Sequence, residues 1–189
     1  MKLGILGGTF NPVHIGHLIL AEEIREKAGL DKIIFVPAYL PPHKVSSDIA
    51  AASDRFNMLK MALKGNPHFG ISDAEIKRQG QSYTIDTVRQ LKDRFPDDEL
   101  YFITGSDLLK YLDEWKDLSE ILQLVKFIVA TRPGYPLEKI PAYISTVSIR
   151  AVDVSGFEVR QAAKGGKSFR YLVPEQVFNY ITKRKLYTK

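Results

Sequence analysis

The spacing of apolar residues along the chain predicts an alternation of strands and helices. Short apolar runs of strand length are found at residues 2–6, 32–36, 100–104 and 126–130. Weaker strand patterns follow within residues 69–77 and at residues 148–152. Apolar positions with helical spacing indicate helices at about residues 14–28, 53–64, 84–94 and 119–124, and two more close the chain. Two residues suit helix ends: Ser53 as an N-cap, and Gly29 just past a C-terminus.

The order of these elements indicates the fold class. A strand, a helix and a second strand follow one another within residues 2–36, and such short connections favour parallel strands with a right-handed crossover. The continued alternation predicts an α/β fold with a doubly wound, Rossmann-like parallel sheet and a small helical C-terminal region at about residues 155–189. No boundary divides residues 1–189, so we expect a single domain.

Composition and charge exclude several classes of site. The 189 residues include no cysteine, which excludes disulfides, thiolate metal ligands and a cysteine nucleophile. No stretch approaches the roughly 18 apolar residues of a membrane helix, so we expect a cytoplasmic protein without membrane association. The net charge is +5, but basic residues are scattered among acidic ones, which favours small anionic substrates over nucleic acid. Homo-oligomerisation stays open.

The segment GGTFNPVHIGH, residues 7–17, follows the first predicted strand and enters the first helix. Ligands of open parallel sheets bind at the carboxyl ends of strands, where this segment is expected. Gly7 and Gly8 leave room for a nucleotide to approach the backbone. Thr9 and Phe10 can offer main-chain N–H groups, and Thr9 a hydroxyl, to phosphate oxygens. The segment therefore predicts an anion site.

Two histidines strengthen this prediction. His14 and His17 are three residues apart, so on a helix they share one face. The partial positive charge of a helix N-terminus favours phosphate beside them. A zinc site is less favoured, because no third ligand stands nearby and there are no thiolates. We therefore expect phosphate binding and no protein-held metal.

The pattern resembles the [ST]-F-x-P-x-H-x-G-H signature of the nucleotidyltransferase superfamily, and its HIGH string is shared with class I aminoacyl-tRNA synthetases. Asn11 stands where many relatives have aspartate. The resemblance implies that ATP is bound by this segment, with His14 and His17 at its α- and β-phosphates.

A second stretch, VSGFEVR at residues 154–160, resembles the I-S-S-T-x-I-R motif of the same superfamily. Ser155 and Arg160 match, whereas Gly156 and Phe157 replace the middle Ser and Thr. Ser155 suits a helix N-cap whose hydroxyl and following amides can face a phosphate. Arg160 is expected at the β- and γ-phosphates of ATP. The alternatives are ordinary capping for Ser155 and a surface ion pair for Arg160.

Three further stretches, VPAYLPPHK, SYTIDT and GSDLLKYLDEW followed by TRPG, resemble bacterial nicotinate-mononucleotide adenylyltransferases, and the resemblance covers nearly the whole chain. It implies that Lys44 and Arg132 serve the acceptor phosphate. Thr84 and the main chain near Tyr111 would hold the nicotinate carboxylate, and Trp115 would stack on the pyridine ring. Solvation for Lys44, a salt bridge for Arg132 and core packing for Trp115 are the alternatives.

The same resemblance implies that Gly105 and Asp107 lie near the ribose or adenine of ATP. For Asp107 a helix N-cap is the alternative, and both roles can hold together.

The expected reaction is an in-line attack of the acceptor 5′-phosphate on the α-phosphorus of ATP, with Mg²⁺ bridging phosphates and pyrophosphate leaving. The product with nicotinate mononucleotide is deamido-NAD, in NAD biosynthesis. Within the superfamily, nicotinamide mononucleotide or pantetheine phosphate are alternative acceptors. A dinucleotide-binding oxidoreductase would require G-x-G-x-x-G, which fits poorly here. A non-catalytic nucleotide-binding regulator is the third class.

Overall fold

The computed structural model describes residues 1–41, 49–131, 140–150 and 152–188, with only the backbone described at residues 107–110. Its centre is a six-stranded sheet in which every neighbouring pair is parallel. The strand order is β3-β2-β1-β4-β5-β6. The strands are β1 (Lys2–Gly8), β2 (Lys32–Pro37), β3 (Phe69–Ile71), β4 (Glu99–Gly105), β5 (Lys126–Thr131) and β6 (Ile144–Ser148). The predicted doubly wound parallel sheet is confirmed.

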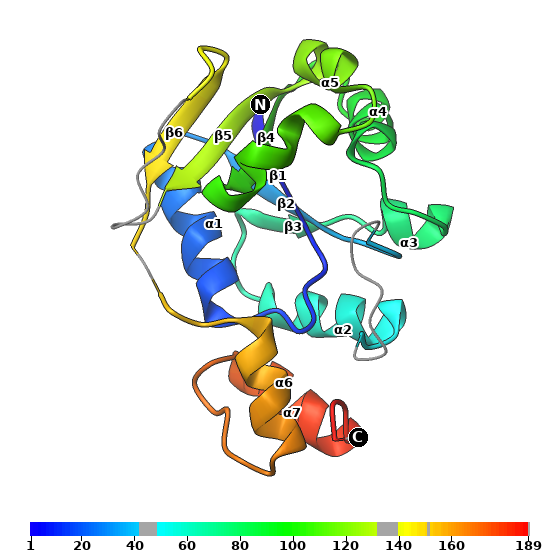
Figure 1. Cartoon of the computed structure of the whole chain (residues 1–189), viewed down its shortest axis with the longest axis vertical. Coiled ribbons are helices and arrows are strands. Elements are labelled where there is room, and N and C mark those ends of the chain that lie inside the picture. Colours follow the sequence, from blue (N-terminus) through cyan, green and yellow to red (C-terminus); the bar gives the residue numbers. More distant parts are fainter. Residues whose placement is uncertain (42–48, 132–139, 151, 189) are drawn as a thin grey trace.

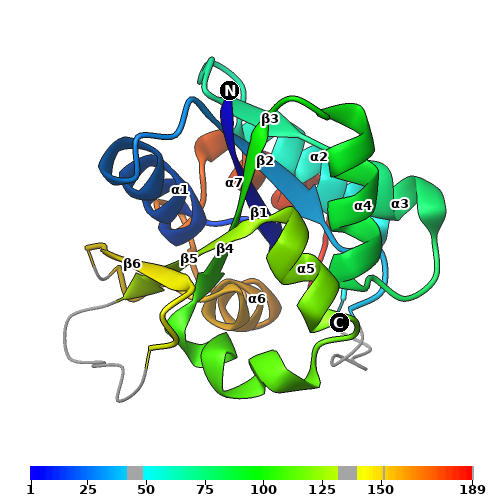
Figure 2. The same ribbon diagram turned by 90° about the horizontal axis from the view of Figure 1, so that it is seen from above.

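Helices connect the strands and cover both faces of the sheet (Figures 1 and 2). Their bounds are α1 (Ile15–Lys27), α2 (Ala52–Ala62), α3 (Ala74–Arg78), α4 (Thr84–Arg94), α5 (Leu118–Leu124), α6 (Gly156–Lys164) and α7 (Glu175–Arg184), together with a 3-10 helix η1 (Ser106–Glu114). The helices α6 and α7 gather at one end of the molecule, where α7 packs against α2 (Figure 1). The predicted helical C-terminal region is present.

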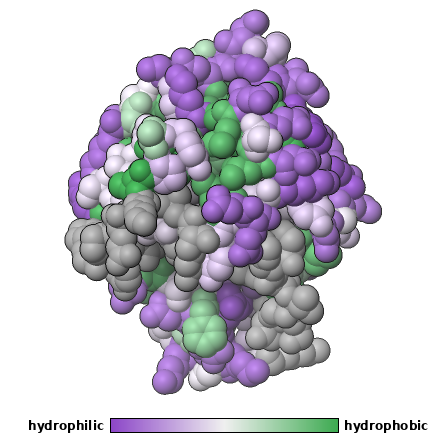
Figure 3. Space-filling model, turned by 45° about the horizontal axis from the view of Figure 1, so that its top comes forward, coloured by the Kyte–Doolittle hydropathy of each residue, from purple (hydrophilic) through white to green (hydrophobic). Residues whose placement is uncertain are grey.

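Two apolar cores flank the sheet because its central strands, β1, β2, β4 and β5, are buried on both faces. On one face, buried residues of α1, α2, α6 and α7 pack on Leu6 and Ile103. On the other, buried residues of η1, α4 and α5 pack on Ile5 and Phe102. The alternation along β1 and β4 therefore divides the molecule into two sides. On the face shown in Figure 3, hydrophilic residues cover most of the surface and apolar ones gather in its upper centre.

The structure corrects two predictions at element boundaries. The last strand is residues 144–148 and not 148–152, since its partner β5 pairs Phe127 with Ile144 and Thr131 with Ser148. Helix α2 begins at Ala52 with Ala51 as N-cap, so Ser53 lies inside it. Two elements were not predicted: α3 lies within residues 69–77, after the strand found there, and the chain after β4 forms η1.

The order of strands marks one place on the sheet for a ligand. Connections run from β1 to one side through β2 and β3, and to the other side through β4 to β6. In sheets of this kind the crevice lies outside the carboxyl ends of the strands where the order reverses, here β1 and β4. Among the described helices, none has the length and apolar character needed to cross a membrane.

Candidate active site

The carboxyl end of β1 continues into residues 7–17, which we call the nucleotide loop. Gly7 is exposed, and Gly8 and Thr9 are half-buried, so the main chain is accessible at the sheet edge. Phe10 is buried and has φ 47°, a left-handed conformation that is costly for an aromatic residue. The Asn11–Pro12 peptide bond is cis. The loop is thus a packed turn with one accessible edge.

The two histidines stack on each other at the start of α1. His14 is the N-cap, His17 lies in the first turn, and their ring centroids are 3.7 Å apart. The Phe10 ring meets the His17 ring edge to face at 5.0 Å. The main-chain N–H of His14 donates to Nδ1 of His17 at 3.2 Å. A neutral His17 ring therefore carries its proton on Nε2, which can donate to a phosphate oxygen.

Gly16 allows this packing. A Cβ atom at residue 16 would lie 3.1 Å from Nδ1 of His14 and 3.6 Å from the carbonyl oxygen of Val154. The segment that precedes α6 therefore passes directly against the first turn of α1. The glycine brings together two parts of the chain that are distant in sequence.

Arg160 reaches the nucleotide loop from α6. Its Nη1 donates to the main-chain oxygen of Asn11 at 2.7 Å, across 149 positions of sequence. A Cβ atom at Gly156 would lie 3.0 Å from that same oxygen, so the glycine lets the first turn of α6 approach the loop. The structure thus brings Arg160 to the loop that carries His14 and His17.

Ser155 forms a capping box with Glu158. Its Oγ accepts from the Glu158 main-chain N–H at 3.2 Å, and Glu158 Oε2 accepts from the Ser155 N–H and hydroxyl at 2.8 and 3.0 Å. The predicted N-cap is confirmed, and its hydroxyl proton is directed at a carboxylate. Contact of Ser155 with phosphate stays a prediction. Phe157, beside it, is exposed, and the Arg160 guanidinium lies 6.0 Å from its ring centroid.

Arg55 is a buried cation that sequence reasoning missed. Its side chain is 1% exposed and donates to three main-chain oxygens: Thr9 at 2.7 Å, Tyr39 at 3.0 Å and Ala50 at 3.0 Å. Burial lowers the pKa of this guanidinium below its ordinary value. The Thr9 carbonyl belongs to the connection between β1 and α1, and the Tyr39 and Ala50 carbonyls belong to the two ends of the connection between β2 and α2. One side chain therefore joins two connections at the sheet edge.

The signal for Arg55 was its place on a helix face. Residues 55, 58, 59 and 62 share one side of α2, and Met58 and Leu59 are fully buried. Charged residues are rarely buried unless they are paired, so an arginine on the apolar face of a helix indicates a buried partner.

Asn11 and Tyr187 were also missed. The Tyr187 hydroxyl donates to Oδ1 of Asn11 at 2.8 Å, and the Ala50 N–H donates to the same oxygen at 3.0 Å. Burial raises the pKa of the Tyr187 phenol, and the charges of Arg160 and Arg55 oppose that shift only partly. No local pattern identifies Tyr187, because its partner lies 176 positions away.

Trp115 lies on the other face of the sheet, at the end of η1. It is half-buried and packs edge to face on Phe102 at 5.4 Å, with Phe127 at 6.0 Å. Core packing is therefore part of its role, and stacking on a pyridine ring stays a prediction. Tyr111 is 46% exposed on the same 3-10 helix.

Two turns meet beside Trp115, and we call residues 81–84 and 111–116 the acceptor turns. The Lys116 ammonium lies 4.9 Å from the ring centroid of Tyr83, which precedes Thr84 at the start of α4. The first of these turns also joins the loop after β2, because the Ser82 N–H donates to Leu40 at 3.0 Å. Residues 36–41 of the stretch VPAYLPPHK, the stretch SYTIDT and the end of η1 are therefore neighbours.

Some predicted residues lie outside the described part of the chain. Lys44 and Arg132 are among them, as is the side chain of Asp107. Gly105, predicted beside ATP, is the N-cap of η1. The alternative of Asp107 as an N-cap is wrong, because η1 begins at Ser106, directly after β4 ends.

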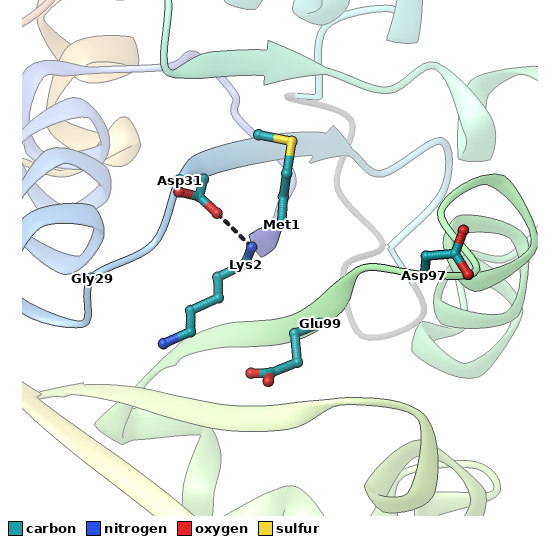
Figure 4. A pocket seen from close by; sticks show the side chains of 6 residues that line it. All are labelled: Met1, Lys2, Gly29, Asp31, Asp97 and Glu99. Carbon is teal, nitrogen blue, oxygen red and sulfur yellow. Dashed lines mark hydrogen bonds between the residues drawn. The ribbon is translucent and has the colours of Figure 1, made fainter.

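A hollow of about 470 Å³ at the opposite end of β1 and β4 differs in character from this site. Its lining is shown in Figure 4 and includes Asp31, Asp97 and Glu99 beside Lys2, whose N–H donates to Asp31 at 2.7 Å. Three carboxylates disfavour a polyphosphate, and the hollow lies at the amino ends of the strands. It does not compete with the nucleotide loop as an ATP site.

The chain is similar to known proteins over most of its length. Residues 5–162 match the family model described as cytidylyltransferase-like. The nicotinate-nucleotide adenylyltransferase of Bacillus subtilis (strain 168) is 42% identical over 186 residues, which cover 98% of each chain. A protein of Geobacillus thermodenitrificans (strain NG80-2), named as a probable nicotinate-nucleotide adenylyltransferase, is also 42% identical over 98% of this chain and 86% of its own.

A solved structure shows the same fold at lower identity. The Plasmodium falciparum nicotinic acid mononucleotide adenylyltransferase, complexed with NaAD, superimposes with a TM-score of 0.76. The sequences are 19% identical, and the match covers 98% of this chain and 97% of the other.

Proposed function

The chain belongs to the nicotinate-nucleotide adenylyltransferase family, and we propose that it transfers the AMP unit of ATP to nicotinate mononucleotide. The products are deamido-NAD and pyrophosphate, a step of NAD biosynthesis. The observation that carries the proposal is the stacked pair His14 and His17 at 3.7 Å on the loop to which Arg160 is hydrogen-bonded at 2.7 Å. Histidine and arginine donors converge there on the ligand edge of the sheet.

The chemistry requires positioning more than a protein nucleophile. An oxygen of the acceptor 5′-phosphate forms a bond to the α-phosphorus of ATP, while the bond from that phosphorus to the β-bridging oxygen breaks and pyrophosphate leaves. Both reactants are anions, so the protein's work is to align them and to neutralise charge on the equatorial and leaving oxygens.

The described residues suit these tasks. Nδ1 of His17 accepts the main-chain N–H of His14, which fixes the orientation of the ring, and we assign His17 with His14 to the α- and β-phosphates. Arg160 donates one N–H to the main-chain oxygen of Asn11, and its guanidinium has four more N–H groups that can bind the leaving pyrophosphate. Gly7, Gly8, Thr9 and Phe10 would face the nucleotide, and Ser155 and the first amides of α6 the pyrophosphate.

Mg²⁺ would enter with ATP. Among the residues described, no three His, Asp or Glu side chains gather to hold a metal ion. Phosphate oxygens and water are the ligands that Mg²⁺ keeps in nucleotide sites of this kind. We therefore treat the ion as part of the substrate, where it would neutralise charge on the phosphates.

The acceptor would bind beside the acceptor turns. Trp115 offers a half-buried indole, and Thr84 lies at the start of α4, where partial positive charge favours the nicotinate carboxylate. Main-chain groups near Tyr111, and the cations Lys44 and Arg132, complete the proposed set. A nicotinamide lacks the negative charge, so donors in this place select the acid.

The proposed setting is the cytoplasm, with small molecules and not nucleic acids as partners. Supporting it are the substrates named for the relatives and the scatter of basic residues among acidic ones.

Acceptor choice can be measured directly. The purified protein is incubated with ATP, Mg²⁺ and, in turn, nicotinate mononucleotide, nicotinamide mononucleotide and pantetheine phosphate, and pyrophosphate release is followed. We expect the highest kcat/KM with nicotinate mononucleotide. Equal values for the two pyridine mononucleotides would contradict the carboxylate-selective pocket, and no release with any acceptor would contradict the enzymatic function itself.

A further inference from the structure

The amide side chain of Asn11 links the nucleotide loop to the segment that follows α7. Its Oδ1 accepts two hydrogen bonds, from the Tyr187 hydroxyl at 2.8 Å and from the Ala50 N–H at 3.0 Å. Its main-chain oxygen accepts from Nη1 of Arg160 at 2.7 Å. One buried residue, 8% exposed, therefore has contacts with three separate parts of the chain.

We propose that Tyr187 is a positioning residue for the ATP site, which it serves by fixing Asn11 and, through Asn11, the nucleotide loop and Arg160. The proposal rests on the function proposed above, because it names a further residue for that reaction. Tyr187 itself does not touch substrate in this account. Its effect is transmitted through the loop.

The backbone around Tyr187 supports this role. Helix α7 ends at Lys185, which has φ 51°, and Tyr187 has φ 63°. The left-handed region is costly for an aromatic side chain, and such conformations persist where the surroundings require them. The Leu186 N–H, bonded to Ile181 at 3.1 Å, helps turn the chain back, and the Tyr187 hydroxyl then meets Asn11.

A displacement of Asn11 would affect both sides of the ATP site. The residue lies between Phe10 and His14 in sequence, and its main-chain oxygen faces both Arg160 and the first turn of α6 at Gly156. The acceptor turns belong to the other face of the sheet, where Trp115 packs on Phe102. Loss of the Tyr187 hydrogen bond should therefore weaken ATP binding and leave acceptor binding nearly unchanged.

Tyr180 provides a matched control on the same segment. Its hydroxyl donates to Oδ1 of Asp54 at 2.7 Å and ties α7 to α2. Tyr180→Phe removes one hydrogen-bonded hydroxyl from the C-terminal region, as Tyr187→Phe does. It leaves the hydrogen bonds of Asn11 in place. A general loosening of α7 would appear in both variants.

The experiment compares the two variants with the wild-type protein. KM for ATP, KM for nicotinate mononucleotide, kcat and the urea midpoint are measured for each. We expect Tyr187→Phe to raise KM for ATP about three- to tenfold, the scale of one lost hydrogen bond, and to change KM for the acceptor less than about twofold. Tyr180→Phe should leave KM for ATP at the wild-type value. An unchanged KM for ATP in Tyr187→Phe, or equal changes in both variants, would overturn the proposal.

A double-mutant cycle tests the route through Asn11. In an Asn11→Ala background, Tyr187→Phe should have no further effect on KM for ATP, because the hydrogen-bond acceptor is already gone. Effects that simply multiply would show that Tyr187 acts by another path. The urea midpoints show that each variant is folded under the conditions of the kinetic measurements.

The two proposals fail in different ways. Wild-type activity with an unaffected Tyr187→Phe variant contradicts only the positioning role. If the wild-type protein releases no pyrophosphate, the proposed function fails. The positioning role is then decided by equilibrium binding of ATP with Mg²⁺ to wild-type protein, Tyr187→Phe and Tyr180→Phe, with the same threefold to tenfold weakening of Kd expected only for Tyr187→Phe.

Discussion

The nucleotide loop and the acceptor turns are built differently, although both lie at the carboxyl edge of one sheet. The loop is fixed by buried groups, since Phe10 is 2% exposed and Asn11 and His14 are 8% exposed. The buried Arg55 also donates a hydrogen bond to the main-chain oxygen of Thr9. The acceptor turns present half-buried or exposed side chains, Thr84, Trp115 and Tyr111, on short turns. Both regions contain ring contacts, but only the nucleotide loop is also held by a buried arginine and a buried asparagine.

This contrast fits a division of labour. Charge stabilisation in a transition state requires donors that are already oriented, and buried hydrogen bonds orient them. Recognition of one acceptor among several requires side chains that can differ without disturbing the phosphate site. We therefore expect substitutions in the loop to affect catalysis or folding, and substitutions in the acceptor turns to affect acceptor KM.

The largest effect is expected from His17→Ala. The variant loses an oriented Nε2 donor and should reduce kcat on the order of 10²–10³-fold, the scale for one preorganised donor. Initial rates of pyrophosphate release measure it. His68→Ala is the control, since His68 is an exposed histidine bonded to the Asp31 oxygen, away from the loop. Turnover at the control level in His17→Ala would contradict the assignment.

The next largest effect is expected from Arg55→Ala, which should lower the free energy of unfolding. Three main-chain oxygens lose charged donors in a buried place, so the free energy of unfolding should fall by about 3 kcal/mol or more. Urea unfolding measures the change. Arg94→Ala, which removes an exposed arginine from α4, should shift it by less than about 0.5 kcal/mol. A loss as small for Arg55 would mean that the two connections do not depend on it.

Trp115→Ala tests the acceptor side. If the indole stacks on the pyridine ring, KM for nicotinate mononucleotide should rise about tenfold, as expected for loss of an aromatic pair. KM for ATP should stay near the wild-type value, and Trp115→Phe should lie between the two. An equal rise in KM for ATP and KM for the acceptor would contradict the separation of the two regions.

The smallest effect expected is a change in acid sensitivity at Glu23. Its carboxylate accepts the Arg150 N–H at 2.9 Å and pairs with Lys27 at 3.0 Å, holding the segment that leads to α6. These contacts lower the pKa of Glu23, with the Arg150 hydrogen bond first among them. The carboxylate therefore stabilises the fold above its unfolded pKa of about 4.3, and this contribution is lost as pH falls through the lower folded value.

Glu23→Gln removes this titration. The urea midpoint of the variant should fall less steeply than that of the wild-type protein as pH drops below about 4.3. Glu26→Gln, on the same helix but with a side chain 65% exposed, should follow the wild-type curve. Parallel curves of urea midpoint against pH for all three proteins would contradict a role of the Glu23 carboxylate in holding the segment that leads to α6.

The elements that could be predicted from sequence are those whose information is local. The central strands are continuous apolar runs because they are buried on both faces, and Ser155 caps α6 because Glu158 stands three residues on. The bounds of α4, Thr84–Arg94, were predicted to the residue. Convergence of the histidines with Arg160 was expected from the motifs and their positions at strand ends.

What sequence could not predict depends on distant partners. The edge strand β6 is set by its pairing with β5, and its own residues alternate weakly, so the expected strand was displaced by four residues. The 3-10 helix η1 lacks the length and spacing of an α-helix. Arg55 and Tyr187 act through oxygens 46 and 176 positions away, and no window of local sequence contains both partners.

The central position of β1 has a consequence for how the molecule assembles. Lys2 pairs with Glu99 and Leu6 with Ile103, so one edge of β1 is covered by a strand that lies nearly a hundred residues later in the sequence. Contacts of such long sequence separation form slowly, and an open strand edge invites aggregation meanwhile. The edge between β1 and β4, where we propose that phosphate binds, therefore forms late in folding, and a nascent chain that ends before β4 can pair β1 with β2 but leaves its other edge open.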